Sequence, residues 1–226
     1  MAFLALDTST EHLSLALTTP TGIVARDWHV GQRHAEHSLP YLEALLIETG
    51  IAREQIEGVA YGMGPGSFTG LRIGCGIAQG LAFGLGVPLI GICTLEALAA
   101  QVDGDRAYVC LDARMNQVYV AAYERDGSRW HEVIPPTLAD PDAVPLPDTD
   151  GWIGLGSGFA AYGDALTGHL GAHLASTLPD RFPRAVEILT LALPRFAAGE
   201  ALAPHDAPLL YLRDKVALKT HERPKK

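Results

Sequence analysis

GMGPGSFTGLRIGCGIAQGLAFGLG, residues 62–86, is the stretch that says most about the fold of this chain. Its glycine-rich start predicts a turn that opens a helix over about 68–85. Apolar runs at 58–62 and 87–92 predict a strand on each side of that helix. Strands alternating with helices are typical of α/β proteins. No GK[ST] follows the glycines, and no GxGxxG begins within the turn, so the common nucleotide-binding motifs are excluded.

The residues before this unit predict three more strands and one more helix. Short apolar or alternating runs indicate strands at 3–6, 13–17 and 23–30. Apolar side chains recur at helical spacing over 39–49, and Gly50 follows where a helix is expected to stop. The first half therefore has the expected order βββαβαβ.

A weaker copy of this plan follows in the second half of the chain. LALD at 4–7 resembles VCLD at 109–112, a shift of 105 residues. GPGS at 64–67 resembles GLGS at 154–157, a shift of 90 residues. Two similarities in the same order predict a duplicated α/β architecture with two lobes, the second of them shorter.

These patterns divide the chain into a first lobe at 1–102, a second lobe at 103–212 and a basic tail at 213–226. Proline-rich residues 135–147 are interpreted as an irregular excursion inside the second lobe. The tail has six Lys/Arg against two Asp/Glu, whereas the whole chain has a net charge of −9. This balance disfavours a protein whose whole surface binds nucleic acid. The tail is either a solvated terminus or a contact for RNA or an acidic partner.

Composition excludes several other classes of protein. With 226 residues, 48% of them hydrophobic and 19% charged, the chain has enough apolar side chains for a packed core. Cys75, Cys93 and Cys110 have neither zinc-ligand nor disulfide-framework spacing, so they are expected to be buried thiols in a reducing compartment. The N-terminus has no basic segment typical of a signal peptide, and Arg72 and Gln79 interrupt the apolar helix. We expect a cytosolic protein without a membrane span.

A phosphate or nucleotide could bind weakly at the two turns that end the first and fourth predicted strands. The backbone N–H groups of a glycine-rich turn at a helix start suit an anion. The alternative is that the glycines permit tight packing, that the aspartate bonds its own turn and that the serine caps the helix. The candidate residues are Asp7, Thr8, Ser9, Gly64, Gly66 and Ser67.

Glycines recur every four residues along the predicted helix, at Gly76, Gly80 and Gly84. Each has an intrinsic helix propensity about 1 kcal/mol less favourable than alanine, so a close contact must offset the loss. That contact lies either in the core or across a subunit interface. His34 and His37 form an HxxH pair, which is a weak metal signal without a third ligand. A solvated helix start is the better interpretation.

Several motifs resemble those of the TsaB family, also called YeaZ, of bacterial tRNA threonylcarbamoyladenosine biosynthesis proteins. The similarity extends over nearly the whole chain, and GPGSFTGLRIG is its most specific part. It implies a two-lobed fold of the actin, Hsp70 and sugar-kinase type. The quoted motifs are LALDTST, GPGSFTGLRIG, AQGLAFGLGVPLIGICTLEALA, DARMNQVYVAAY and YLRDKVA.

The resemblance implies a cytoplasmic protein that works with TsaD, its larger paralogue, and TsaE, an ATPase. Together they transfer a threonylcarbamoyl group from threonylcarbamoyl-adenylate to the adenosine beside the anticodon of tRNA. TsaD carries the catalytic metal, in an HxxxH motif, and this sequence has no HxxxH in a compatible context. The DTST turn also lacks the phosphate-loop glycine of active kinases. The resemblance therefore implies a non-catalytic scaffold, without a catalytic residue, metal or cofactor of its own, which activates TsaD.

Such a scaffold is expected to contact TsaD through its first helix and its glycine-rich helix. The same surface would form a homodimer when TsaD is absent, and TsaE and tRNA would join through the complex. A small ATP-binding phosphotransferase of the same superfold remains the alternative, and a peptidase is disfavoured because no catalytic triad or ligand spacing is present. The expected interface residues are Leu42, Leu45, Leu46, Ile73, Gly76, Ile77 and Gly80.

Overall fold

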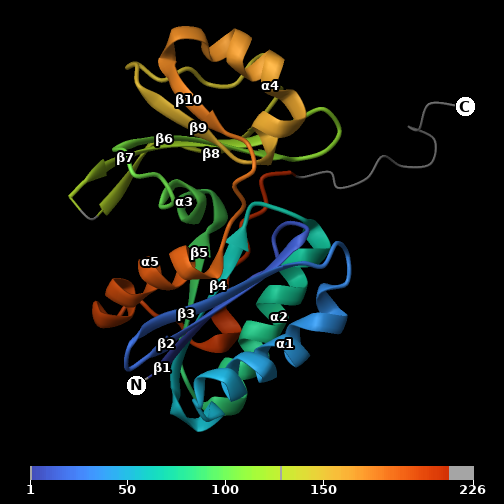
Figure 1. Ribbon diagram of the computed structural model, residues 1–226, viewed down its shortest axis with the longest axis vertical. Coiled ribbons are helices and arrows are strands. Elements are labelled where there is room, and N and C mark those ends of the chain that lie inside the picture. The colour runs from blue at the N-terminus through green and yellow to red at the C-terminus, as the bar shows by residue number, and fades with distance from the viewer. Residues whose placement is uncertain (1, 128, 214–226) are drawn as a thin grey trace, which may run out of the picture.

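The computed structural model describes residues 2–127 and 129–213 and has two lobes, each built around a five-stranded sheet (Figure 1). The two sheets lie one above the other, and helices cover them. The elements are β1 (Ala2–Asp7), β2 (His12–Thr19), β3 (Gly22–His29), α1 (His34–Thr49), β4 (Ile56–Gly64), α2 (Phe68–Leu85), β5 (Leu89–Cys93), α3 (Thr94–Ala99), β6 (Arg106–Asp112), β7 (Val118–Asp126), β8 (Arg129–Ala139), β9 (Trp152–Leu155), α4 (Ser157–Leu170), β10 (Leu174–Leu178) and α5 (Ala185–Ala197), with short 3₁₀ turns at Arg53–Gln55, Gly171–His173 and Pro204–Asp206.

The first sheet has the strand order β3-β2-β1-β4-β5. Strand β1 is its centre, antiparallel to β2 and parallel to β4, with Leu4 opposite Leu17 on one side and Val59 on the other. Both faces of β1 are covered, which explains its uniformly apolar sequence. The chain reverses after Asp7, so the first tight turn lies at the edge where β4 also ends.

The second sheet has the matching order β8-β7-β6-β9-β10, which confirms the duplicated plan and the actin, Hsp70 and sugar-kinase type of fold. The two motifs at 64–67 and 154–157 both join a strand to a helix, as expected. In the described part of the second half, however, no helix corresponds to α1. The second copy of the βββαβαβ plan is therefore shorter, as expected, because it lacks this helix, and the shift falls from 105 to 90.

Each sheet has helices on both faces, but the last helix of each half covers the sheet of the other half. Helices α1 and α2 cover one face of the first sheet, and α5 covers the other. Helices α4 and α3 cover the two faces of the second sheet. In Figure 1, α5 lies beside β4 and β5, and α3 lies beneath the second sheet.

This arrangement corrects the predicted boundary between the lobes. The segment 103–212 is not one lobe, because α5 packs on the first sheet and the backbone N–H of Ala185 donates to the buried Ser14 Oγ at 2.7 Å. The first lobe consists of residues 2–93 together with 185–213. Helix α3, at 94–99, follows the first lobe in the chain but covers the second sheet. The predicted basic tail begins at Arg213, and its other residues lie outside the described part of the chain. Within residues 2–127 and 129–213, no helix is long and apolar enough to cross a membrane.

Candidate functional site: an interlobe cleft and an exposed helical face

A cleft of about 760 Å³ lies between the lobes. On the first lobe its walls are the turn after β1 and the first turn of α2, and on the second lobe the turn between β6 and β7 and the start of α4. Its mouth is bordered by residues 210–213. A cleft between lobes is a usual position for a ligand. Residues that bind a phosphate there would have to line its walls.

Asp7 does not face this cleft. Its Oδ1 accepts from the backbone N–H of Ser9 at 3.0 Å and from Ser9 Oγ at 2.8 Å. Its Oδ2 is buried without a partner, and a Cβ atom placed on Gly62 would come within 2.0 Å of that oxygen. Burial raises the pKa of Asp7 to about 7, despite the opposing hydrogen bonds from Ser9. The interpretation that Asp7 bonds its own turn is confirmed.

The glycines of the turn before α2 are packed against that same turn. A Cβ atom on Gly70 would lie 2.0 Å from the carbonyl oxygen of Thr8, and one on Gly66 would lie 2.6 Å from that of Ser9. The backbone N–H of Ser67 donates to Ser9 O at 2.7 Å, and Ser67 Oγ accepts from Gly70 N at 3.3 Å. Ser67 is thus the helix cap that the sequence indicates.

Gly64 has a different neighbour, the segment of residues 207–213, which we call the strap. Gly64 has a φ of +109°, and a Cβ atom there would lie 2.6 Å from the carbonyl oxygen of Leu210. The backbone N–H of Leu210 donates to Met63 O at 2.7 Å, and Tyr61 Oη donates to Pro208 O at 2.5 Å. The glycine allows the strap to lie directly on the end of β4.

The predicted phosphate residues therefore form a packed junction rather than an open cradle. Of the six, only Ser9, Gly66 and Ser67 reach the wall of the cleft. Asp7 and Thr8 are buried behind them, and Thr8 Oγ1 donates to Gly70 O at 2.8 Å. Tight packing, the alternative at the sequence level, accounts for these glycines, and the proposed phosphate contact by Asp7, Thr8 and Gly64 is corrected.

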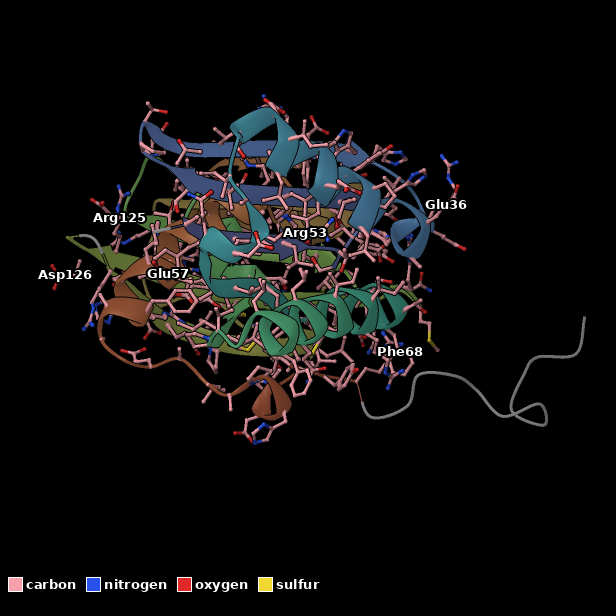
Figure 2. The ribbon with its side chains drawn as sticks, turned by 90° about the horizontal axis from the view of Figure 1, so that it is seen from below. Glu36, Arg53, Glu57, Phe68, Arg125 and Asp126 are labelled. Atoms are coloured by element: carbon pink, nitrogen blue, oxygen red, sulfur yellow. The ribbon has the colours of Figure 1, made fainter. Side chains whose placement is uncertain are left out.

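The glycines in the later turns of α2 lie on its outer face. Cβ atoms placed on Gly76, Gly80 or Gly84 would have no atom within 4 Å. Phe83 on the same helix is 83% exposed, and Ile73 and Ile77 are half-buried beside the glycines. Of the two interpretations left open, a core contact of the glycine stripe is not found among residues 2–127 and 129–213. Helices α1 and α2 lie next to each other on this side of the molecule (Figure 2).

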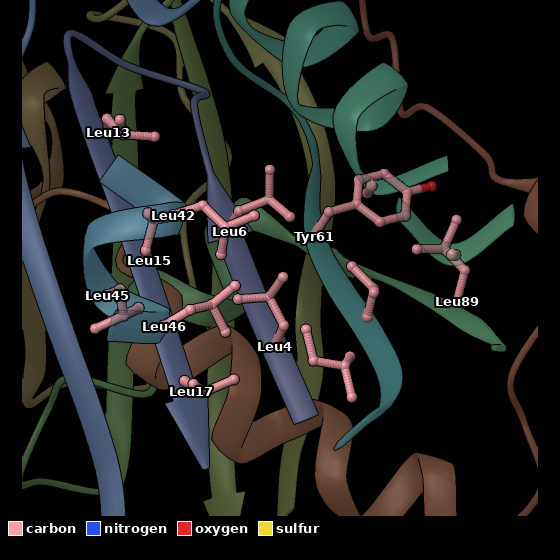
Figure 3. Close-up of a cluster of buried hydrophobic side chains, with 14 of the residues drawn as sticks. Leu4, Leu6, Leu13, Leu15, Leu17, Leu42, Leu45, Leu46, Tyr61 and Leu89 are labelled. Carbon is pink, nitrogen blue, oxygen red and sulfur yellow. The ribbon is translucent and has the colours of Figure 1, made fainter. Parts of the chain in front are cut away.

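The α1 leucines lie on the opposite side of their helix. Leu42, Leu45 and Leu46 are 5%, 1% and 6% exposed and point at the first sheet among Leu4, Leu15 and Leu17 (Figure 3). Their assignment to a partner surface is corrected, because their side chains are the core of the lobe. The exposed large apolar side chains of α1 are Leu39, 55% exposed, and Ile47, 77% exposed.

The histidines at the start of α1 serve packing. His34 is buried, and its Nε2 lies 3.2 Å from the carbonyl oxygen of His12. His37 stacks on Tyr41 with ring centroids 5.1 Å apart. Among residues 2–127 and 129–213, no three His, Cys, Asp or Glu side chains lie close enough together to hold a metal ion. Cys75, Cys93 and Cys110 are free and buried, as expected.

Sequence reasoning missed the charged residues at the cleft mouth. Glu11, from the first lobe, and Arg114, from the second, form an ion pair of 2.5 Å. Arg213, which was assigned to the tail, instead bonds the turn between β6 and β7. The motif DARMNQ contains Arg114, but the sequence does not indicate that its partner Glu11 lies 103 positions away.

The duplicated sheets, the packed junction between the two turns and the exposed face of α2 define an actin-like two-lobed α/β protein. The sequence model of the family described as "TsaD: tRNA N6-adenosine threonylcarbamoyltransferase" matches residues 13–217. The chain is 36% identical to the tRNA threonylcarbamoyladenosine biosynthesis protein TsaB of Escherichia coli K12, with 97% of both chains covered. It is 34% identical to the protein of that name from Haemophilus influenzae, over 97% of this chain and 96% of that one.

A solved structure agrees with these sequence relatives. YeaZ from Pseudomonas aeruginosa superimposes with a TM-score of 0.85 at 31% identity, covering 93% of this chain and 99% of that chain. The chain belongs to the TsaB family of tRNA threonylcarbamoyladenosine biosynthesis proteins.

Proposed function

We propose that this chain is the scaffold subunit that holds and activates TsaD during threonylcarbamoyl transfer from threonylcarbamoyl-adenylate to the adenosine beside the anticodon of tRNA. In this proposal TsaD holds the metal, TsaE supplies the ATPase, and both TsaE and tRNA join through the complex. The observation that carries the proposal is the outer face of α2, where Cβ atoms added to three glycines would meet no neighbouring segment among the described residues.

The three glycines lower the intrinsic stability of helix α2. Each one weakens an exposed helix by about 1 kcal/mol relative to alanine, and three lie within three turns. Gly70 and Gly74, earlier in the helix, are needed because Thr8 lies against them, but Gly76, Gly80 and Gly84 face open space. A second helix could approach this smooth stripe closely enough to bury both backbones. The reason for the glycines is then a partner outside the chain.

The neighbouring side chains extend this surface. Ile73 and Ile77 flank the glycines, and Phe83 and Ile47 are the two most exposed large apolar side chains described. We therefore keep Ile73, Gly76, Ile77 and Gly80 in the proposed interface, and replace the buried α1 leucines with Leu39 and Ile47. One surface would serve both TsaD and a second copy of this chain, so the two assemblies would exclude each other.

The test is the variant Gly80→Leu, with Gly168→Leu in α4 as a matched control. Both glycines are exposed and lie inside helices, and a Cβ atom placed on either would have nothing within 4 Å, so both variants should fold. Gly80→Leu should abolish co-elution with TsaD on size exclusion, whereas Gly168→Leu should leave it unchanged. Circular dichroism melting verifies that each variant is folded. A folded Gly80→Leu protein that still co-elutes with TsaD would remove this face from the interface.

The phosphotransferase alternative has less support from the cleft. The turn that would cradle a phosphate is occupied by Thr8 and Ser9, and the guanidinium of Arg114 is already paired with two carboxylates. Isothermal titration of the isolated protein with Mg-ATP tests this alternative directly. Tight binding would favour it.

A further inference from the structure

The mouth of the interlobe cleft is crossed by an arginine that bonds one acid from each lobe. Arg114 Nη2 lies 2.5 Å from Glu11 Oε1 of the first lobe, and its Nη1 lies 3.0 Å from Asp112 Oδ2 of the second. Asp112 Oδ1 also accepts from the backbone N–H of Arg114 at 2.8 Å. Asp112 therefore fixes the direction of the arginine, and the contact to Glu11 is the one that joins the lobes.

A second arginine joins the lobes through the strap. Arg213 Nη2 donates to Gln117 Oε1 at 2.9 Å and to the carbonyl oxygen of Ala113 at 3.1 Å. Residues 113–117 form the turn between β6 and β7, so Arg213 binds the same turn that carries Arg114. The strap itself is docked on the first lobe through Met63 O and Tyr61 Oη. The turn of the second lobe is thus held from two directions.

The turn has a backbone that needs such support. Arg114, Met115 and Asn116 have φ values of 61°, 55° and 58°, the left-handed region that side chains other than glycine disfavour. Three such residues in a row persist where surrounding contacts hold them. The contacts that hold this turn are those of Arg213, Asp112 and the backbone bond from Gln117 N to Arg114 O at 3.1 Å.

The chain crosses between the lobes at two places outside the cleft lining, and these two crossings touch. Gln101 Nε2, in the first crossing, donates to the carbonyl oxygen of Phe182, in the second, at 2.7 Å. The ring of Phe182 stacks on His12 of β2, with centroids 3.7 Å apart. Two crossings that touch each other and lie outside the cleft lining are positions about which the lobes can turn.

We propose that Glu11, Arg114 and Arg213 form a latch that holds the interlobe cleft closed, and that its release lets the lobes open about the paired crossings near Gln101 and Phe182. The cross-lobe ion pair is solvent-exposed, with Arg114 72% and Glu11 49% exposed. Exposed pairs are weak and are screened by salt, so the latch favours the closed lobes by a modest factor that falls as ionic strength rises. The inference does not depend on the proposed docking function.

The test measures the distance between lobes in the full chain by double electron–electron resonance. Spin labels go on Glu54→Cys in the first lobe and Ala165→Cys in the second, both exposed positions, while the three native cysteines are buried. The labelled protein is mixed with an excess of unlabelled parent, so that labels on two copies of the chain do not contribute, and it should then give one main distance at low salt. Glu11→Gln, Arg213→Gln and their combination should add a second, longer distance, and salt of about 1 M should do the same to the parent.

Arg26→Gln is the matched control, because it removes an exposed ion pair with Glu48 on the first lobe, outside the cleft lining. It should leave the distance distribution unchanged. Glu11→Gln removes only a charge at an exposed position, so it is informative even if the Arg213→Gln protein fails to fold, which thermal melting would reveal. A folded Glu11→Gln protein with the parent's distribution at low and high salt would overturn the latch.

Discussion

Two glycines in α2 show how one residue type can meet opposite demands within a single helix. Gly70 is buried against the carbonyl oxygen of Thr8, which belongs to a turn 62 positions earlier in the chain. Gly80, less than three turns later, has open space where its Cβ atom would be. The sequence presents both as the same letter in a repeating pattern. The two glycines differ because the turn after β1 lies against Gly70, whereas no described segment lies against Gly80.

Replacing each glycine by alanine distinguishes these demands. Gly70→Ala should lower the free energy of unfolding by about 2 to 3 kcal/mol, because backbone must move to admit the methyl group. Gly80→Ala should raise it by up to about 1 kcal/mol through helix propensity. Urea denaturation at 25 °C measures both, at a protein concentration low enough to keep the chain monomeric. Equal effects of the two substitutions would contradict the packing described for the turn before α2.

Asp7 couples the same turn to pH. Its pKa is raised from 3.8 to about 7, with burial as the largest cause, so the folded state keeps a proton that the unfolded chain releases. The stability contributed by the neutral carboxyl is complete below pH 3.8 and is lost as the pH rises through about 7. The charged Asp7 carboxylate therefore lowers the free energy of unfolding at alkaline pH.

Asp7→Asn should remove this cost while keeping an oxygen for Ser9 to bond. We expect a gain in the free energy of unfolding of about 2 to 4 kcal/mol at pH 8, shrinking steadily toward pH 4. Urea denaturation at several pH values measures the difference, with exposed Asp164→Asn as the control for residue type. A gain that is the same at pH 5 and pH 8 would show that titration of Asp7 is not its source.

At the scale of elements, the local pattern predicted the helices and strands of residues 3–92 well, but not what lies against them. Periodicity placed α2 over about 68–85, which is its observed range, and predicted that Gly50 ends α1. The leucines of α1 were assigned to the wrong side, because a face of leucines looks the same whether it meets a sheet or a partner. In the same way, nothing in the letters of α5 says which of two sheets it covers.

The attachment of α5 to the first sheet depends on a buried serine. Ser14 Oγ accepts from Ala185 N at the start of α5 and donates to Asp27 Oδ1 at 2.5 Å. Ser14→Ala should lower the free energy of unfolding by about 1 to 3 kcal/mol, because it leaves a buried N–H without an acceptor. Thr190→Ala, on the exposed side of α5, should change it by less than about 0.5 kcal/mol. A silent Ser14→Ala variant in chemical denaturation would show that α5 is held by its apolar face alone.

At the scale of the molecule, the two short similarities at shifts of 105 and 90 were sufficient to predict the duplication. The two shifts differ by 15 residues because the described part of the second half lacks a helix equivalent to α1, which has 16 residues. This cause could not be inferred from the sequence, because shortened loops would produce the same shift. The cross-lobe contacts of Arg114 and Arg213 were equally hidden, since each arginine meets its partners only after both halves have folded.

The return of α5 and the strap to the first sheet has a consequence for how the protein is made. A ribosome releases residues 2–99 long before residues 185–213, so the nascent first lobe has one face of its sheet uncovered while the second lobe is synthesised. Residues 106–178 are contiguous and can fold as soon as they emerge. The lobe that begins the chain is therefore the last to be completed, and a ribosome that stalls late leaves its apolar sheet exposed to chaperones and proteases.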